Sequence, residues 1–259
     1  MRASSLAFVS LVVVPIFMAA QKSEPEHYIP PWKTPWTYAE ANHWSRLDPE
    51  YAACNVGKEQ SPIDIRVAQK ADLPPLQFEY KSSALKYVIN NGHTIRVNYH
   101  DAPGTENSLV VGEQRYQLTQ FHFHRPSEEH IHGRPYDMVV HFMHQASNGK
   151  VAGVAVLVKA GSANATVQQI WAHLPEKEGQ QEVAGVELNP EGLLPRVTSY
   201  FTYQGSQTAP PCTEGVTWFV LKTPIELSAE QISAFAKLYP HDVRPLQPLN
   251  GRVVKESRQ

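Results

Sequence analysis

Two pairs of histidines in this chain have His-x-His spacing. His122 and His124 lie in LTQFHFH, where polar and aromatic residues alternate as in a strand, so both imidazoles project from one face. Two imidazoles side by side can bind one metal ion from the same direction. The other pair, His130 and His132, lies in a polar segment rich in Gly and Pro, which predicts solvated loop residues.

A third histidine, His141, lies in the next predicted strand, on the same face as Val139 and Met143. The short connection between the two strands predicts that His141 faces the first pair. Three neutral imidazoles suit zinc and leave a fourth tetrahedral position open, as a catalytic zinc site requires. Taken singly, each of these residues is better explained as a hydrogen-bonded core histidine, so the prediction rests on the set of three.

The elements that would position these residues are mainly strands. Segment 228–239 is the best helical candidate, with Ser228 as N-cap and Gln231 at the capping-box position, and 166–174 is a weaker one. Asn148-Gly149 is a strong hairpin signal. Runs rich in β-branched and aromatic residues predict five strands, at 85–89, 94–99, 115–124, 136–144 and 151–159. The pattern predicts a mainly β (α+β) domain with a largely antiparallel sheet and short peripheral helices.

Length and composition limit the class of protein. The chain of 259 residues is 42% hydrophobic, which suffices for a large core and argues against a disordered or fibrous protein. It carries 23 Lys and Arg against 25 Asp and Glu, with no basic cluster, so a nucleic-acid partner is not expected. No repeat or shift in composition marks a second domain.

The N-terminal segment has the pattern of a secretory signal peptide over residues 1–20, a weakly basic start followed by an apolar run. The run is about 15 residues, too short for a stable membrane span. A buried N-terminal helix is the alternative. Residues 21–35 are polar and proline-rich, which predicts a flexible lead before a domain over 36–259. The protein is therefore expected to be exported, as a periplasmic or secreted protein.

Export changes how the two cysteines are interpreted. Cys54 and Cys212 form an even pair without CxxC spacing. In an oxidising compartment this predicts one disulfide, with two buried free thiols as the alternative.

From about Trp36 to Arg252 the chain resembles the α-class carbonic anhydrases. The cysteines fall where exported members of this family carry their disulfide, and the resemblance implies a single domain built on a large, mostly antiparallel, twisted central sheet. It rests on motifs in the family's order: QSPIDI (60–65), NNGH (90–93), QFHFH (120–124), SEE (127–129), the strand of His141, GSQTAPPCTEGVTW (205–218) and QPLNGR (247–252).

The resemblance implies a zinc lyase that reversibly hydrates carbon dioxide to bicarbonate and a proton through a zinc-bound hydroxide. Zn²⁺ would be held by His122, His124 and His141. Thr208 would donate a hydrogen bond to Glu128 and orient the hydroxide, and His93 would carry protons away. Sulfonamides and anions are the expected inhibitors. The substrate pocket and water path would be lined by Tyr38, Asn91, Arg96, Gln120, Met143, Gly153, Gln207, Ala209, Val216 and Trp218. Ser61-Pro62 and Pro210-Pro211 match cis prolines of the family.

Some positions depart from the family pattern. Val139 stands where most members have a glutamate that hydrogen-bonds the third zinc histidine, so His141 is expected to lack a charged partner. Gly153, Gln207 and Ala209 stand where valine, leucine and threonine are usual. These replacements predict a wider, more polar pocket mouth, which would slow hydration or add a side esterase activity on small esters.

Two other functions are the alternatives to the zinc lyase. One is a catalytically weak or silent carbonic anhydrase-like binding or storage protein, against which the three intact histidines argue. The other is an unrelated zinc hydrolase, disfavoured because the chain has neither an HExxH nor a GxSxG pattern. Asn164-Ala165-Thr166 is also a glycosylation sequon.

Overall fold

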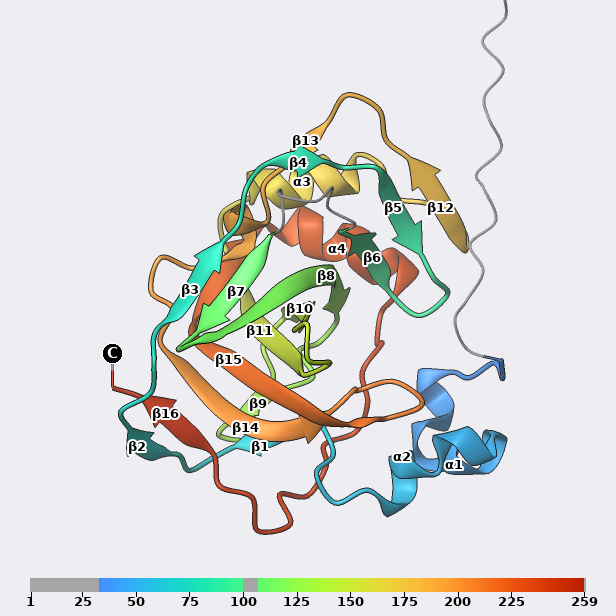
Figure 1. Cartoon of the computed structure of the whole chain (residues 1–259). Coiled ribbons are helices and arrows are strands. Elements are labelled where there is room, and N and C mark those ends of the chain that lie inside the picture. Colours follow the sequence, from blue (N-terminus) through green and yellow to red (C-terminus); the bar gives the residue numbers. More distant parts are fainter. Residues whose placement is uncertain (1–32, 100–106, 259) are drawn as a thin grey trace, which may run out of the picture.

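The computed structural model describes residues 33–99 and 107–258 (Figure 1). The expected signal peptide lies outside the described residues, as does most of the expected lead. The last residues of that lead contact the domain, since the Tyr51 hydroxyl donates a hydrogen bond to the Thr34 carbonyl at 2.7 Å. Over the described ranges, no helix combines the length and hydropathy needed to cross a bilayer.

Twelve of the described strands form one twisted sheet. The order along it is β12-β5-β6-β8-β10-β11-β15-β14-β16-β2, with β7 also beside β8 and β3 beside β7. Neighbours are antiparallel except β11 with β15 and β16 with β2, which confirms the predicted fold class. The strands of this sheet are β2 (Gln69–Ala71), β3 (Leu76–Glu79), β5 (Tyr87–Asn90), β6 (Ile95–Asn98), β7 (Ser108–Val111), β8 (Gln114–His124), β10 (Met138–Gln145), β11 (Val151–Ala160), β12 (Gly179–Glu182), β14 (Tyr200–Ser206), β15 (Glu214–Leu227) and β16 (Lys255–Ser257).

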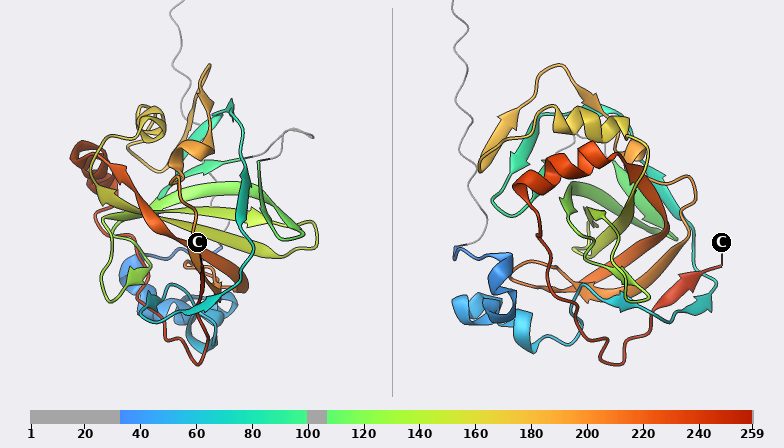
Figure 2. Two further views of the ribbon diagram at one scale, coloured as in Figure 1. Left: turned by 90° about the vertical axis from the view of Figure 1, so that its left-hand side faces the viewer. Right: turned by 180° about the vertical axis from the view of Figure 1, so that it is seen from behind.

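The remaining elements are short. Two small sheets pair β1 (Asp64–Ile65) with β9 (His130–Ile131) and β4 (Ser83–Ala84) with β13 (Glu187–Leu188). Figures 1 and 2 show α3 and α4 together at one end of the molecule and α1 and α2 at the other. The helices are α1 (Trp44–Leu47), α2 (Ala53–Val56), α3 (Ala165–Trp171) and α4 (Ala229–Leu238), and the 3₁₀ turns are 38–43, 49–51 and 190–193.

The five predicted strands are all present, with ends shifted by one or two residues, as β5, β6, β8, β10 and β11. The helix at 228–239 is α4, and its capping box is formed as predicted: Ser228 Oγ accepts from the Gln231 N–H and Gln231 Oε1 from the Ser228 N–H, each at 3.2 Å. The weaker helical prediction is α3, whose N-cap is Asn164. Asn164 Nδ2, which glycosylation would modify, donates to the Gly192 carbonyl at 2.9 Å.

The central strands are buried on both faces. One face belongs to the main core, which includes Phe121, Phe123 and Phe142 together with residues of α3 and α4. The other belongs to a smaller cluster, the metal-side core, formed by Ile63, Ile65, Val139, Ala155, Leu157, Tyr203, Val216, Trp218, Val220 and Val254. Alternation along β8 and β10 therefore places one set of side chains in the main core and the other on the face of the histidines.

The remaining predictions on loops have mixed outcomes. Cys54 and Cys212 form the predicted disulfide, which ties α2 to the loop between β14 and β15. Both expected cis prolines are cis, and Arg125-Pro126 is a third. His132 is exposed, as expected of a loop residue. The prediction for His130 is wrong, because its backbone pairs with β1 and its side chain is half-buried.

Candidate metal centre and its cavity

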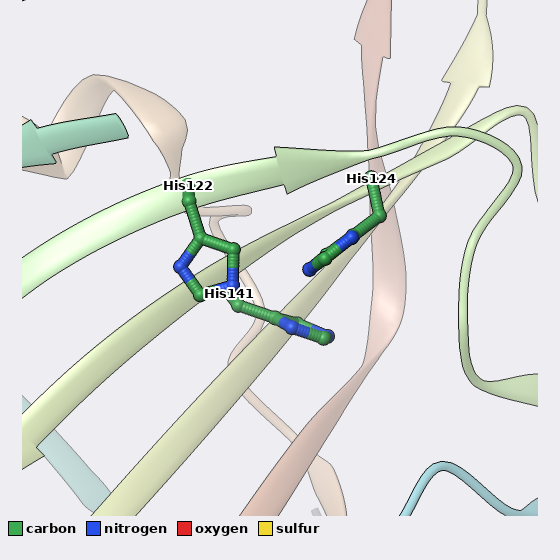
Figure 3. A group of neighbouring side chains, drawn as sticks. All are labelled: His122, His124 and His141. Atoms are coloured by element: carbon green, nitrogen blue, oxygen red, sulfur yellow. The ribbon is translucent and has the colours of Figure 1, made fainter. Parts of the chain in front are cut away.

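Three histidines from two neighbouring strands converge on one point (Figure 3). His122 and His124 project from β8, and His141 from β10, where it is the direct register partner of His122. One ring nitrogen of each lies within 4.8 Å of those of the other two. The predicted juxtaposition is therefore present.

His122 and His124 are held by neutral acceptors through their Nδ1 atoms. His122 Nδ1 lies 2.8 Å from Gln120 Oε1, and His124 Nδ1 lies 2.7 Å from the Asp242 carbonyl oxygen. Nδ1–H is the donor in both contacts, so Nε2 carries the free lone pair. Burial lowers the pKa of both rings well below the usual value, which keeps them in the neutral, metal-binding form.

His141 has a charged partner, so the expectation drawn from Val139 is wrong. His141 Nε2 lies 3.0 and 3.1 Å from the two carboxylate oxygens of Glu129. Burial disfavours a charge on His141, but the negative charges of Glu129 and Glu128 raise its pKa overall. Valine removes the carboxylate from the strand, and the loop that carries SEE delivers another.

The residues fit a metal ion. His124 Nε2 and His141 Nδ1 are buried without a hydrogen-bond partner, as lone pairs reserved for a cation would be. All three second nitrogens are hydrogen-bonded to oxygens, the usual arrangement around metal-binding histidines. A set of three imidazoles suits zinc and leaves a ligand position open.

Glu128 and Thr208 lie beside the histidines. Glu128 is fully buried, and its Oε1 accepts a hydrogen bond from the Arg244 N–H at 2.8 Å. Its Oε2 has no hydrogen-bond partner and lies 3.6 Å from His124 Nε2 and 3.8 Å from His141 Nδ1. Burial raises the pKa of Glu128 to about 7, while the nearby Thr208 hydroxyl acts in the opposite direction. Thr208 thus lies beside the carboxylate to which its hydroxyl is expected to donate.

The histidines and Thr208 line a cavity of about 380 Å³. Most residues expected from the family motifs line it: Tyr38, Asn91, His93, Arg96, Gln120, Met143, Gln207, Ala209 and Trp218. Asn91 also shapes the turn that carries His93, because its Oδ1 accepts from the N–H groups of His93 and Thr94 at 3.0 and 2.8 Å.

Other lining residues were not found from the sequence. Several belong to segment 33–51, which carries none of the motifs quoted above; its aromatic residues are the one signal that the sequence offers. They are Lys33, Trp36, Asp48, Glu50 and Tyr51, and the cavity is completed by Thr94, Pro210 and Pro211.

Gly153 does not widen the cavity as expected. A Cβ atom on Gly153 would lie 2.7 Å from the Trp218 ring, so the indole occupies the space that a valine would fill. Val216 is packed in the metal-side core, and neither Gly153 nor Val216 reaches the cavity lining. The polar character of the mouth therefore comes from Gln207, which is exposed, and Ala209.

The family model described as eukaryotic-type carbonic anhydrase matches residues 39–258. The chain belongs to this family. A carbonic anhydrase of Nostoc sp. is 39% identical over 221 residues, covering 83% of this chain and 82% of the relative. Other relatives named carbonic anhydrase are also about 40% identical to this chain. They confirm the expectation that this protein is an enzyme of the carbonic anhydrase class.

Structural neighbours of this carbonic anhydrase family member confirm the fold. The α-carbonic anhydrase of Thermovibrio ammonificans, solved with the inhibitor sulfanilamide, is 42% identical with a TM-score of 0.81, covering 86% of this chain and 99% of that one. Dioscorin DB3L of Dioscorea polystachya is also related, at 34% identity over 223 residues, covering 82% of this chain and 80% of its own length.

Proposed function

We propose that this protein catalyses the reversible hydration of carbon dioxide to bicarbonate and a proton, with Zn²⁺ held by His122, His124 and His141. The observation that carries the proposal is the convergence of three imidazole nitrogens within 4.8 Å of one another in a cavity. Zinc bound there acidifies water and so supplies a nucleophile at neutral pH.

Thr208 and Glu128 orient that nucleophile. Ionised Glu128 can only accept hydrogen bonds, so the Thr208 hydroxyl donates a hydrogen bond to Glu128 and its oxygen remains free to accept one. Thr208 Oγ1 would then accept a hydrogen bond from the nucleophile, whose lone pair would be left free to face carbon dioxide. Burial favours the protonated form of Glu128, and a divalent cation held by the histidines would favour the ionised form that this arrangement needs.

The cavity wall supplies the apolar surface for carbon dioxide. Met143 and Trp218 line the cavity near the histidines, and Trp218 lies with its ring centroid 4.7 Å from that of His141. Trp218 is held by a hydrogen bond from its Nε1 to the Ser206 carbonyl at 3.0 Å. This support fixes the wall against which an uncharged substrate packs.

His93 is the group proposed to carry the released proton from the cavity to solvent. It lies in the cavity lining, half-buried, with Tyr38, Asn91 and Arg96 along the same wall, where they would support a path of water molecules. Stopped-flow hydration across pH on zinc-loaded wild type and His93→Ala tests this role. The variant is expected to slow in weak buffer and to recover with an added imidazole buffer; an unchanged rate contradicts the assignment.

The whole proposal is tested by metal content and inhibition. One zinc per chain and hydration inhibited by a sulfonamide are expected; the sulfanilamide complex of the Thermovibrio ammonificans enzyme supports that choice of probe. The rival is a catalytically weak or silent carbonic anhydrase-like binding or storage protein. A stable protein that binds no zinc and shows no hydration would establish the rival.

Export to the periplasm or the medium is proposed on two grounds, the signal-like residues 1–20 and the Cys54–Cys212 disulfide, which needs an oxidising compartment. Cell fractionation followed by N-terminal sequencing of the mature protein tests it. A new N-terminus near Gln21 outside the cytoplasm is expected, and an intact Met1 in the cytoplasm would contradict export.

A further inference from the structure

Glu129 is a fully buried carboxylate that takes no part in the chemistry proposed above. Both of its oxygens lie within 3.1 Å of His141 Nε2. Because an ionised carboxylate only accepts hydrogen bonds, the contact places the ring proton on Nε2 and leaves the lone pair on Nδ1. Nδ1 is the buried ring nitrogen without a hydrogen-bond partner, on the side of Glu128.

The loop that carries Glu129 is fixed on both sides of this residue. Ser127 Oγ donates to the Glu129 carbonyl oxygen at 2.7 Å. The next N–H, of His130, donates to the Ile63 carbonyl at 3.2 Å, where β9 pairs with β1. The backbone therefore delivers the carboxylate to His141 from a defined position.

Val139 explains why the carboxylate comes from this loop. It is 0% exposed, lies two residues before His141 on the same face of β10, and belongs to the metal-side core. A glutamate there, as in most of the family, would be within reach of the same imidazole. With Glu129 already present, it would put two negative charges into one dry site, which is costly.

We propose that Glu129 is the positioning residue of His141. From its loop it performs the role that a valine at position 139 cannot perform. This inference rests on the proposed metal site. The neutral partners of the other two rings, Gln120 and the Asp242 carbonyl, make Glu129 the strongest of the three contacts, because its hydrogen bond is charge-assisted. Its loss should therefore be felt in how tightly the metal is held.

The test compares zinc binding by wild type, E129Q and the exchange variant E129V/V139E. Zinc affinity and release are measured by competition with a chelator, and thermal unfolding of each zinc-free protein is recorded in parallel. E129Q is expected to bind zinc roughly 10- to 100-fold more weakly, with faster release. The folded exchange variant, whose carboxylate returns to the strand, should recover most of the loss. V139E alone should lower the melting temperature of the zinc-free protein.

Glu214→Gln is the matched control, because it also converts a hydrogen-bonded carboxylate to an amide but contacts Gln60 and the Glu59 N–H instead of a histidine. It should bind zinc as wild type does. E129Q with wild-type affinity and release would overturn the inference. If zinc-free E129Q does not fold, Glu129→Asp replaces it, and wild-type affinity in that variant is equally decisive. Failure of wild type itself to bind zinc would instead overturn the proposed function.

Discussion

The imidazole of His93 lies face to face on the indole of Trp36, with ring centroids 3.7 Å apart and an angle of 5° between the planes. Trp36 is almost fully buried and also packs edge-on against Trp44. Burial lowers the pKa of His93 to about 4, so in this position the ring is neutral at pH 7 and accepts a proton reluctantly. In the stacked position His93 is therefore a slower proton carrier than a solvated imidazole, and its proposed role is weakened but not removed.

Trp36→Ala should raise the hydration rate in weak buffer several-fold, because an unstacked, solvated His93 regains a pKa near 6.5. Stopped-flow rates in weak buffer and in concentrated imidazole buffer measure the effect, and no gain is expected in the second. The double variant Trp36→Ala/His93→Ala is the control. A gain that persists in the double variant would show that His93 is not its source.

Gly153→Val should destabilise the protein by about 1 to 3 kcal/mol, because the new side chain collides with the Trp218 ring. Urea unfolding measures the change. Adding Trp218→Leu removes the ring that is struck, so the second substitution should cost less in the Gly153→Val background than alone. Equal costs in both backgrounds would contradict the packing described here.

The polar cavity mouth predicts hydrolysis of a small aryl ester beside carbon dioxide hydration. Gln207→Leu and Ala209→Thr restore the residues usual in the family, and both positions line the cavity. The double variant should hydrolyse the ester several-fold more slowly and hydrate carbon dioxide at least as fast. Spectrophotometric ester assays and stopped-flow hydration test this pair of outcomes. A wild type with no ester hydrolysis and an ordinary hydration rate would remove the idea.

His144 should make stability depend on pH. It is buried against Tyr80, whose hydroxyl lies 2.6 Å from His144 Nε2, and burial lowers the pKa of His144 to about 3. Below pH 6.5 His144 binds a proton in the unfolded chain but stays neutral in the folded protein. The contribution of neutral His144 to the free energy of unfolding is thus complete above pH 6.5 and is lost as the pH falls toward 3. The free energy of unfolding should fall by about 3 kcal/mol between pH 6.5 and 4 from this residue.

The variant His144→Gln keeps a polar partner for Tyr80 but does not titrate. Urea unfolding of the zinc-free protein from pH 7 to 4 should therefore show a smaller loss of stability in the variant. The slope of its free energy of unfolding against pH should be lower by up to the amount that corresponds to one bound proton. Parallel curves for the two proteins would mean that His144 titrates normally in the fold.

The parts of the fold that were predictable from sequence are those specified locally. Alternation in LTQFHFH placed His122 and His124 on one face of β8, and the Ser228–Gln231 capping box located the start of α4. β14 and β15 were not predicted as strands, although β15 is the longest described strand. Its pairing with β11 is parallel and joins segments far apart in the sequence, which no local pattern records.

The candidate site shows the same division. The histidines, Thr208 and Glu128 follow from motifs, but the contact from Glu129 to His141 depends on the path of a loop between two strands. Gly153 was misjudged for a related reason: a missing side chain leaves space only if no neighbour occupies it, and Trp218 does. Residue types in sequence predict which groups are present, whereas three-dimensional packing decides which of them touch.

The two faces of β8 also bear on what happens when the ion is taken away. Phe121 and Phe123, which are buried in the main core, alternate along β8 with His122 and His124. None of the three histidines belongs to that core, and the oxygens that contact His122 Nδ1 and His124 Nδ1 are protein atoms. If zinc binds as proposed, we therefore expect that the ion can be removed and returned without unfolding the protein.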